Sequence, residues 1–159
     1  MRLRMVLALT DYKTNDYFLN ITKLADVDDN DIAALFYSGY HNSIDDEGES
    51  PDDWKKLVAE FKGNEYRELI GEASLFIKNG NDLASGIVIG KKDDNPYIIA
   101  LATEPNHRHK GFASDLIKTC AMILKDQYKE FVLYVNEENR KAISLYKKLG
   151  FKTEEIIRG

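Results

Sequence analysis

The chain has 159 residues and a mass of 18.2 kDa, with 43% apolar residues, 31% charged residues and a net charge of -5 at pH 7. This composition is typical of one soluble globular domain, and it argues against a general binder of nucleic acid or of anionic membranes. Because Cys120 is the only cysteine, an intramolecular disulfide and a cluster of zinc-binding thiolates are excluded. No apolar run approaches transmembrane length, so we expect a single cytoplasmic domain over residues 1–159 with no metal centre.

The first part of the chain predicts two strands, a helix and a loop. Residues 2–9 become continuously apolar after an alternating start and predict a strand, and residues 17–25 predict a second one. Several potential N-caps precede apolar residues at helical spacing, which predicts a helix over residues 29–40. Residues 43–53 are too acidic and too rich in turn formers to join a core, so they predict a surface loop.

The middle of the chain predicts a second helix and an antiparallel meander. In the stretch SPDDWKKLVAEF, Ser50 suits an N-cap, a proline follows at the first helical position, and the apolar residues form one stripe. Three short β-rich runs follow at residues 72–78, 83–92 and 96–103. The turn signals NGND and KDDNP separate these runs, as expected for neighbouring antiparallel strands.

The last part of the chain predicts a helix, a strand, a helix and a strand. Helical periodicity over residues 112–128 is followed by a buried-strand pattern at residues 130–135. Residues 138–150 predict another helix, which Gly150 can end in the left-handed conformation, and residues 151–157 predict a closing strand. The complete order predicts an α/β domain of the α+β kind, in which helices cover a mixed sheet.

A cationic stretch precedes the third predicted helix. Its ionisable side chains are His107, Arg108, His109 and Lys110. A strand that ends at Thr103, a short loop and a helix that begins near Gly111 would aim unpaired backbone amides at one place, where the helix dipole favours negative charge. The amides near residues 109–114 therefore predict a phosphate site. The alternative is that Gly111 is an ordinary turn glycine in a solvated loop.

The sequence patterns of dinucleotide and nucleoside triphosphate loops are absent, so another phosphate-bearing ligand is expected. Arg108, Gly111 and Ala113 form the pattern R-x-x-G-x-A, which resembles the pyrophosphate-binding motif of the GNAT superfamily of acyl-CoA-dependent N-acyltransferases. Downstream, the stretch NRKAISLYKKLGF at residues 139–151 is similar to the second motif of that superfamily. One helix and one strand separate the motifs, as in the family, and the resemblance spans about residues 17–157.

The resemblance implies a splayed, mostly antiparallel mixed sheet with flanking helices. Strands near residues 98–103 and 131–135 would part to form a V-shaped cleft that holds acetyl-CoA as a cosubstrate. The pantetheine arm would pair with strand backbone groups almost as an added strand would, Asn139 would hold the arm, and the Tyr146 hydroxyl would face the thioester sulfur. The residues expected to contact the cofactor are Leu101, Ala102, Thr103, Arg108, His109, Lys110, Gly111, Phe112, Ala113, Ser114, Asn139 and Tyr146.

The chemistry that the resemblance implies is direct transfer of an acetyl group to a primary amine in a ternary complex. A strand amide near Leu101 or Ala102 would stabilise the oxyanion, and Tyr146 would protonate the departing sulfur as the general acid. A tyrosine with a pKa of about 10 suits a donor role, whereas an amine of similar pKa must lose a proton before it attacks. Because Tyr146 also lies on the apolar stripe of its helix, a packing role is the alternative.

The general base is the open point of this assignment. Many family members carry a glutamate on the strand equivalent to residues 97–103, where this chain has no acid. Glu72, Glu104 and His41 are candidate bases, and a chain of water molecules is another route. Each of the three side chains also has an ordinary explanation as a surface or loop residue.

The acceptor and the partners follow from weaker signals. An acidic loop at residues 43–53 could attract a polyamine, an aminoglycoside or a basic peptide terminus, although a solvated loop is the commoner explanation of such a stretch. The alternatives to an enzyme are a non-catalytic acyl-CoA binding or sensing module, which the missing strand acid favours, and an interaction protein without a ligand. Family members often end in an extra hairpin, so residues 2–9 would supply a strand in compensation, or the open edge would pair with a second copy in a homodimer.

Overall fold

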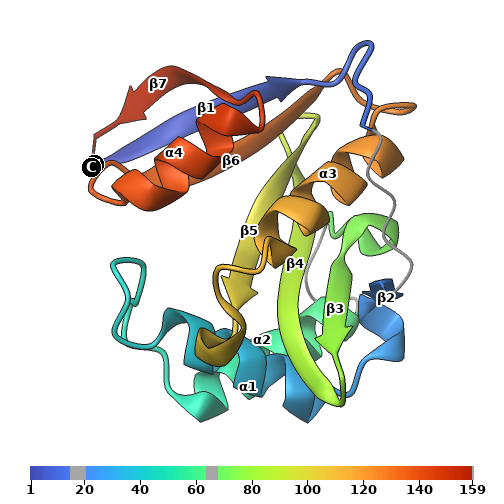
Figure 1. Cartoon of the computed structure of the whole chain (residues 1–159), viewed down its shortest axis with the longest axis vertical. Coiled ribbons are helices and arrows are strands. Elements are labelled where there is room, and N and C mark those ends of the chain that lie inside the picture. The colour runs from blue at the N-terminus through green and yellow to red at the C-terminus, as the bar shows by residue number, and fades with distance from the viewer. Residues whose placement is uncertain (15–20, 64–67, 159) are drawn as a thin grey trace.

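The computed structural model describes residues 1–14, 21–63 and 68–158. Its strands are β1 (Arg2–Ala8), β2 (Ile21–Lys23), β3 (Leu75–Asn79), β4 (Asp82–Lys92), β5 (Asn95–Thr103), β6 (Glu130–Asn136) and β7 (Lys152–Ile157). Its α-helices are α1 (Asp29–Tyr40), α2 (Pro51–Lys62), α3 (Phe112–Leu124) and α4 (Arg140–Lys148). The strands form one seven-stranded sheet in the order β2-β3-β4-β5-β6-β1-β7 (Figure 1), which confirms the mixed α/β fold.

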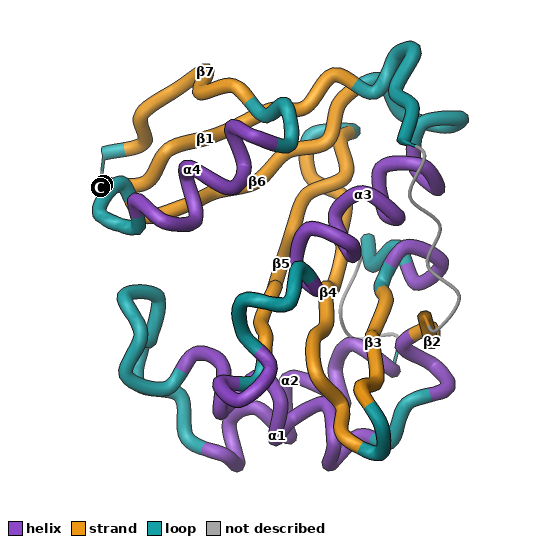
Figure 2. Tube along the Cα trace, in the orientation of Figure 1, coloured by secondary structure: helices purple, strands orange, loops and turns teal. Residues whose placement is uncertain are grey.

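The sheet opens between β5 and β6. These two strands are parallel and pair at Tyr97 and Val132, whereas every other neighbouring pair in the sheet is antiparallel. The register of β4 and β5 shifts so that Val88 opposes Ala100 and Ile89 opposes Ile98, which leaves Ile99 as an extra residue in β5. A bulge of this kind bends a strand, and β5 and β6 diverge beyond their paired position (Figure 2). The predicted splay is therefore confirmed.

Helices cover both faces of the splayed sheet, and the alternation of side chains along the strands divides the core in two. Leu75 and Ile77 of β3 pack in the cluster that includes α3, while Phe76 between them packs with α1 and α2. The same alternation holds for Ile87, Val88 and Ile89 of β4. This period of two is what a strand buried on both faces requires.

The N-terminal strand lies inside the sheet. β1 is antiparallel to β6 on one side and to β7 on the other, so the closing strand does not contact β6 as a neighbour. This arrangement confirms the expectation that residues 2–9 supply a strand. The outer edge of β7 remains the place where a second copy could pair, and the homodimer stays a prediction.

Helix termini agree closely with the sequence patterns where a side chain caps them. α1 begins after Asp28, whose carboxylate accepts hydrogen bonds from the N–H groups of Asn30 and Asp31. α2 begins after Ser50, which forms a reciprocal capping box with Asp53. Among the described residues, none of the helices is long and apolar enough to span a bilayer.

Three predicted boundaries are corrected by the structure. Residues 17–20 lie outside the described part, and after Lys23 the chain forms a 3-10 turn (Leu24–Asp26) that buries Leu24. A second 3-10 turn (Gly71–Ala73) delays the start of β3 to Leu75. α3 ends at Leu124 instead of residue 128, and it is followed by a turn in which the N–H groups of residues 127 and 128 both bond to the Leu124 carbonyl.

Candidate functional site

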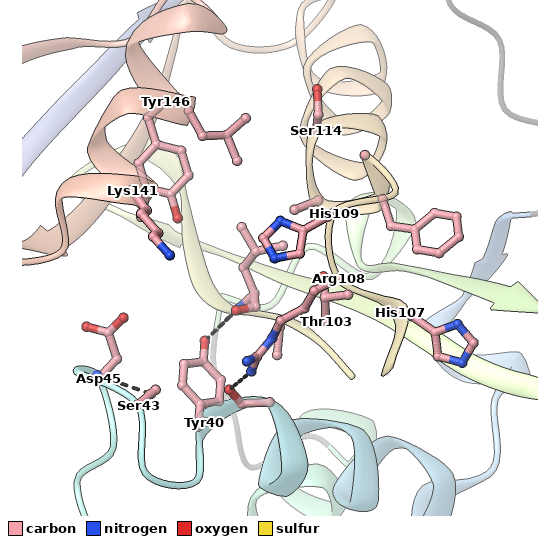
Figure 3. A pocket seen from close by; sticks show the side chains of 18 residues that line it. Tyr40, Ser43, Asp45, Thr103, His107, Arg108, His109, Ser114, Lys141 and Tyr146 are labelled. Carbon is pink, nitrogen blue, oxygen red and sulfur yellow. Dashed lines mark hydrogen bonds between the residues drawn. The ribbon is translucent and has the colours of Figure 1, made fainter. Parts of the chain in front are cut away.

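A cavity of about 460 Å³ lies where the sheet is splayed. Four segments surround it: the end of α1 with the loop that follows, the second half of β5, the start of α3, and one face of α4 (Figure 3). Its lining residues are Gly39, Tyr40, Ser43, Asp45, Leu101, Ala102, Thr103, His107, Arg108, His109, Gly111, Phe112, Ala113, Ser114, Lys141, Ala142, Leu145 and Tyr146. The cavity thus has lining residues from both sequence motifs, residues 108–113 and 139–151.

The start of α3 is open towards this cavity. Gly111 is the N-cap residue, it has a left-handed φ of 82°, and no side chain in the described part caps the helix there. A Cβ atom at Gly111 would meet nothing within 4 Å, so the backbone faces free space. His109 is also left-handed, with a φ of 66°. Successive turn residues of this kind, followed by a helix N-terminus, present N–H groups to an anion.

The cationic side chains before α3 do not all face the cavity. His107 is among the lining residues, but its side chain is only 11% exposed and its ring points away from the cavity (Figure 3). Its Nδ1 lies 3.1 Å from the Asn79 amide and its Nε2 lies 3.3 Å from the Asp82 carboxylate. Arg108 donates a 3.2 Å hydrogen bond from Nη2 to the carbonyl of Gly39 at the end of α1. Lys110 is outside the lining. His107 therefore has a structural role, whereas Arg108 and His109 line the cavity.

The open edge of β5 is occupied by a tyrosine from α1. The hydroxyl of Tyr40 donates a 2.9 Å hydrogen bond to the Leu101 carbonyl and accepts a 2.8 Å hydrogen bond from the Leu101 N–H. The Tyr40 ring stacks on Trp54 at 5.4 Å between centroids and an interplanar angle of 11°. Burial raises the pKa of the Tyr40 hydroxyl, so it stays neutral. This contact was not predicted.

Tyr146 brings a second hydroxyl into the cavity. It lies on α4, packs its ring against Phe151 at 6.0 Å between centroids, and directs its hydroxyl towards the space between α4 and β5 (Figure 3). Desolvation, and then the negative charge of Asp45, raise the pKa of Tyr146 to about 12. A group with this pKa is a proton donor at neutral pH.

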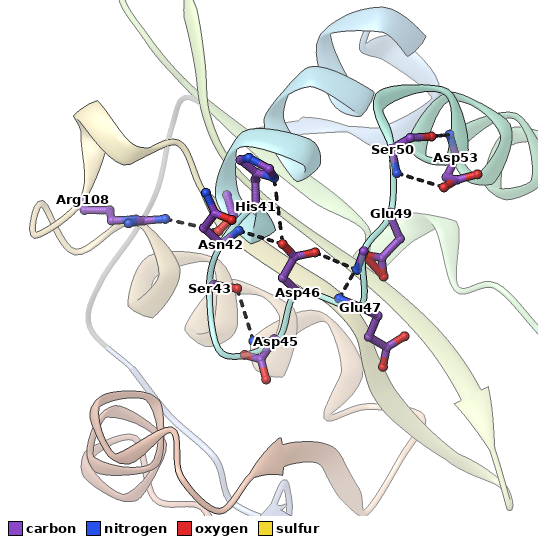
Figure 4. Close-up of polar contacts among 12 residues, drawn as sticks. His41, Asn42, Ser43, Asp45, Asp46, Glu47, Glu49, Ser50, Asp53 and Arg108 are labelled. Atoms are coloured by element: carbon purple, nitrogen blue, oxygen red, sulfur yellow. Dashed lines mark hydrogen bonds and ion pairs between the residues drawn. The ribbon is translucent and has the colours of Figure 1, made fainter.

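The acidic loop after α1 is ordered by its own hydrogen bonds (Figure 4). The Asp46 carboxylate accepts hydrogen bonds from the N–H groups of Asn42 at 2.7 Å and Gly48 at 2.8 Å, which lowers the pKa of Asp46. Asp45 instead reaches α4, where its Oδ2 accepts a 3.0 Å hydrogen bond from Nδ2 of Asn139. The loop, which leads from α1 to α2, therefore contacts the residue that precedes α4.

Asn139 is the N-cap of α4. Its Oδ1 accepts a hydrogen bond from the Ala142 N–H at 3.3 Å, while its Nδ2 donates to Asp45. Asn139 is not among the residues that line the cavity, although the sequence predicts it as a contact of the cofactor arm. Both polar ends of the side chain are engaged, and the residue joins α4 to the acidic loop.

The candidate bases lie away from this cavity. Glu72 is in a 3-10 turn and lines a different cavity beside Lys23 and Leu24. Glu104 caps the 3-10 turn after β5 through a 2.9 Å hydrogen bond from the Asn106 N–H. His41 stacks on Tyr37, and its side chain is 47% exposed. None of these three candidates is among the lining residues, whereas Asp45 is.

Several lining residues were missed by the sequence analysis. They are Gly39, Ser43, Asp45, Lys141, Ala142 and Leu145. Lys141 lies within the second motif, two residues after its asparagine, and Asp45 is in the loop already noted for its charge, so a weak signal existed for both. Within the described residues no group of three or more histidine, cysteine, aspartate or glutamate side chains is placed to hold a metal ion.

This chain is similar to known acetyltransferases in sequence and in fold. The family model described as "Acetyltransferase (GNAT) family" matches residues 30–151. An N-alpha-acetyltransferase of Saccharolobus solfataricus is 32% identical over 65 residues, a match that spans 40% of this chain and 39% of that protein. The crystal structure of PH1933 from Pyrococcus horikoshii OT3 has a TM-score of 0.72 at 22% identity, covering 87% of this chain and 91% of the other. The PaiA N-acetyltransferase of Thermoplasma acidophilum, solved in complex with coenzyme A, has a TM-score of 0.65 at 19% identity, covering 86% and 91%.

Proposed function

Since this chain belongs to the acetyltransferase (GNAT) family, we propose that it transfers an acetyl group from acetyl-CoA to a primary amine. The observation that carries the proposal is one cavity in which the uncapped start of α3, the open edge of β5 and the Tyr146 hydroxyl face one another. The partly matching N-alpha-acetyltransferases support an acceptor with a free α-amine.

The residues of the cavity fit acetyl-CoA as the family's acetyl donor. The free space over Gly111 allows a diphosphate to approach the N–H groups at the start of α3. Leu101, Ala102 and Thr103 provide strand backbone that β6 leaves uncovered, to which an extended arm can add. His109 and the first-turn residues Phe112, Ala113 and Ser114 complete the lining around the diphosphate site.

In the proposed reaction the protein forms no covalent bond with the acetyl group. The amine attacks the acetyl carbon directly, and a backbone N–H near Leu101 or Ala102 stabilises the negative charge on oxygen. Tyr146 gives its proton to the departing sulfur, which its raised pKa and its position on α4 support. Glu72 and Glu104 are not used in this proposal, because neither lines the cavity.

One observation favours a second candidate, a module that binds acyl-CoA without catalysis. β5 carries no acidic side chain in the stretch from Tyr97 to Thr103, so the strand itself offers no carboxylate base. Binding of acetyl-CoA with no transfer to any amine would favour that module.

The test is an assay of free CoA thiol. The purified chain is mixed with acetyl-CoA and one amine in each reaction. The amines are a peptide that has a free α-amine, spermidine and an aminoglycoside. We expect thiol release that depends on the amine. We also expect mass spectrometry to show a product heavier by about 42 Da, the mass that an acetyl group adds when it replaces one hydrogen. Thiol release without acetylated product, or no release with any amine, would contradict the proposed transfer.

A further inference from the structure

A second cavity of about 440 Å³ adjoins the proposed acetyl-CoA cavity. The two cavities share Tyr40 and Asp45 among their lining residues. The second cavity reaches to the bulge residue Ile99 on β5 and to Tyr134 on β6, so it lies along the same opening of the sheet. Tyr40 and Asp45 therefore stand at the junction of two spaces, one of which is assigned above to acetyl-CoA.

The walls of the second cavity suit an organic cation. They include the carboxylates of Asp45, Glu47 and Glu49, and the rings of Tyr40, Trp54 and Tyr134. Arg2 is a lining cation, and it lies over the Tyr134 ring at 5.7 Å from the centroid, at the end formed by the strands. Lys92 lies over the same ring at 5.0 Å from the centroid, and the rings of Tyr40 and Trp54 stack on each other. Because carboxylates attract ammonium groups, the loop end of the cavity is the end that favours a cationic amine.

Asp45 is exposed at the junction, where one hydrogen bond holds its backbone and another holds its carboxylate. Its N–H donates a 3.2 Å hydrogen bond to Oγ of Ser43, and its Oδ2 accepts the hydrogen bond from Asn139 at the start of α4. One carboxylate oxygen is thus held by the helix that carries Tyr146. The charge of Asp45 also contributes to the raised pKa of both Tyr40 and Tyr146, which agrees with its position between them.

On the premise of the acetyltransferase function, we propose that the acceptor is a cationic primary amine that enters through the second cavity, and that the Asp45 carboxylate binds its nitrogen at the junction and accepts its proton during transfer. The acceptor ammonium first loses one proton to solvent. Its nitrogen then forms the C–N bond to the acetyl carbon and passes a second proton to Asp45. The C–S bond breaks with its electron pair on sulfur, which takes the Tyr146 proton, and Asp45 returns a proton to Tyr146.

This assignment places the carboxylate on a loop instead of on β5. It accounts for the absence of an acid from β5 and for the hydrogen bond that joins the acidic loop to α4. It also gives the two carboxylates Glu47 and Glu49 a role in attracting the cation towards the junction.

The experiment compares the full chain with Asp45→Asn and Asp45→Glu. The acceptor probes are spermidine and a peptide with a free α-amine, and acetyl-CoA affinity is measured separately by calorimetry. We expect Asp45→Asn to lower kcat/KM for the amine about 100-fold, the usual contribution of a positioned base, with acetyl-CoA affinity unchanged. Asp45→Glu restores part of the activity. Asp52→Asn removes the same charge from the first turn of α2, outside both cavities, and serves as the matched control.

Each outcome bears on one claim. Turnover by Asp45→Asn within about threefold of the parent, or of the Asp52→Asn control, overturns the role of Asp45 and leaves the acetyltransferase function standing. A parallel loss of acetyl-CoA affinity also overturns it, because Asp45 would then act on the donor. Acetyl-CoA binding with no acetylation of either probe overturns the cationic acceptor. Failure to bind acetyl-CoA contradicts the proposed function itself.

Discussion

The hydroxyl of Tyr40 forms two hydrogen bonds with one residue, because it donates to the carbonyl of Leu101 and accepts from the N–H of the same residue. Both backbone groups lie on the stretch of β5 that β6 leaves uncovered. Tyr40 therefore takes the place of a neighbouring strand at this position. We propose that an acyl-CoA arm that pairs with β5 uses the same two groups, so that its binding displaces the Tyr40 hydroxyl.

Tyr40→Phe is predicted to change stability and affinity in opposite directions. Without the hydroxyl, the Leu101 N–H and carbonyl lose their partner in the free protein, and the free energy of unfolding falls by about 1 to 2 kcal/mol. Acetyl-CoA binding no longer has to break these bonds, so its Kd decreases about threefold to tenfold. Urea denaturation and calorimetry measure the two effects.

Tyr37→Phe is the matched control for that change. Tyr37 is on the same helix, stacks on His41, and is not a lining residue of the cavity. We expect its acetyl-CoA Kd to equal that of the parent. Weaker acetyl-CoA binding by Tyr40→Phe would show that the hydroxyl assists the donor instead of competing with it.

Gly111→Glu is predicted to abolish acetyl-CoA binding. The new carboxylate would occupy the free space over the start of α3, where the diphosphate is proposed to lie. Gly80→Glu is the control, because Gly80 has a φ of 67° and equally open surroundings in the β3–β4 turn. Both changes cost about 1 kcal/mol of stability through the left-handed backbone. Equal acetyl-CoA affinities of the two variants by calorimetry would exclude a diphosphate site at Gly111.

Tyr146→Phe is predicted to lower kcat about 100-fold while acetyl-CoA affinity changes little. The ring and its packing against Phe151 remain, and only the proton donor is removed. Steady-state kinetics with calorimetry separate the two quantities. Losses of the same size in kcat and in affinity would assign Tyr146 to binding alone.

Alkaline pH provides a further test of Tyr146. Its pKa is raised from 10.0 to about 12, so the fold favours the protonated hydroxyl. The resulting stabilisation is complete below about pH 10 and is lost as the pH rises towards 12, because the unfolded chain ionises first. Burial also raises the pKa of Tyr40 and Cys120, which adds to the same slope.

The measurement is the free energy of unfolding by urea at several pH values above about 8. We expect a decline that begins above pH 9.0, the ordinary pKa of the Cys120 thiol, and steepens above about pH 10, where it is shallower in Tyr146→Phe than in the parent. The same decline in both proteins would mean that Tyr146 titrates normally.

Local chemistry explains what the sequence could predict. Asp28 and Ser50 mark the starts of α1 and α2 because their side chains cap N–H groups only two or three residues away. Gly150 ends α4 with a φ of 103°, as its position predicts. The start of α3 at Gly111 followed from the same kind of short-range pattern, and the backbone anion site there stays a prediction.

The features that the sequence could not predict depend on contacts between segments that are far apart in the chain. Tyr40 and Leu101 are 61 residues apart, and Asp45 and Asn139 are 94 apart, so no local pattern relates them. His107 belongs by sequence to the cationic stretch, yet Asn79 and Asp82 of the neighbouring hairpin hold its ring away from the cavity. The site therefore combines local motifs with tertiary contacts. The sequence indicated the charge of the acidic loop, whereas its contact with Asn139 became visible only in the fold.

The most direct test of the proposed function is a crystal structure of the chain with coenzyme A. We expect the diphosphate oxygens within about 3 Å of N–H groups at the start of α3, the arm paired with Leu101 in place of the Tyr40 hydroxyl, and the sulfur beside the hydroxyl of Tyr146. Coenzyme A bound elsewhere, with the Tyr40 and Leu101 hydrogen bonds intact, would contradict the account.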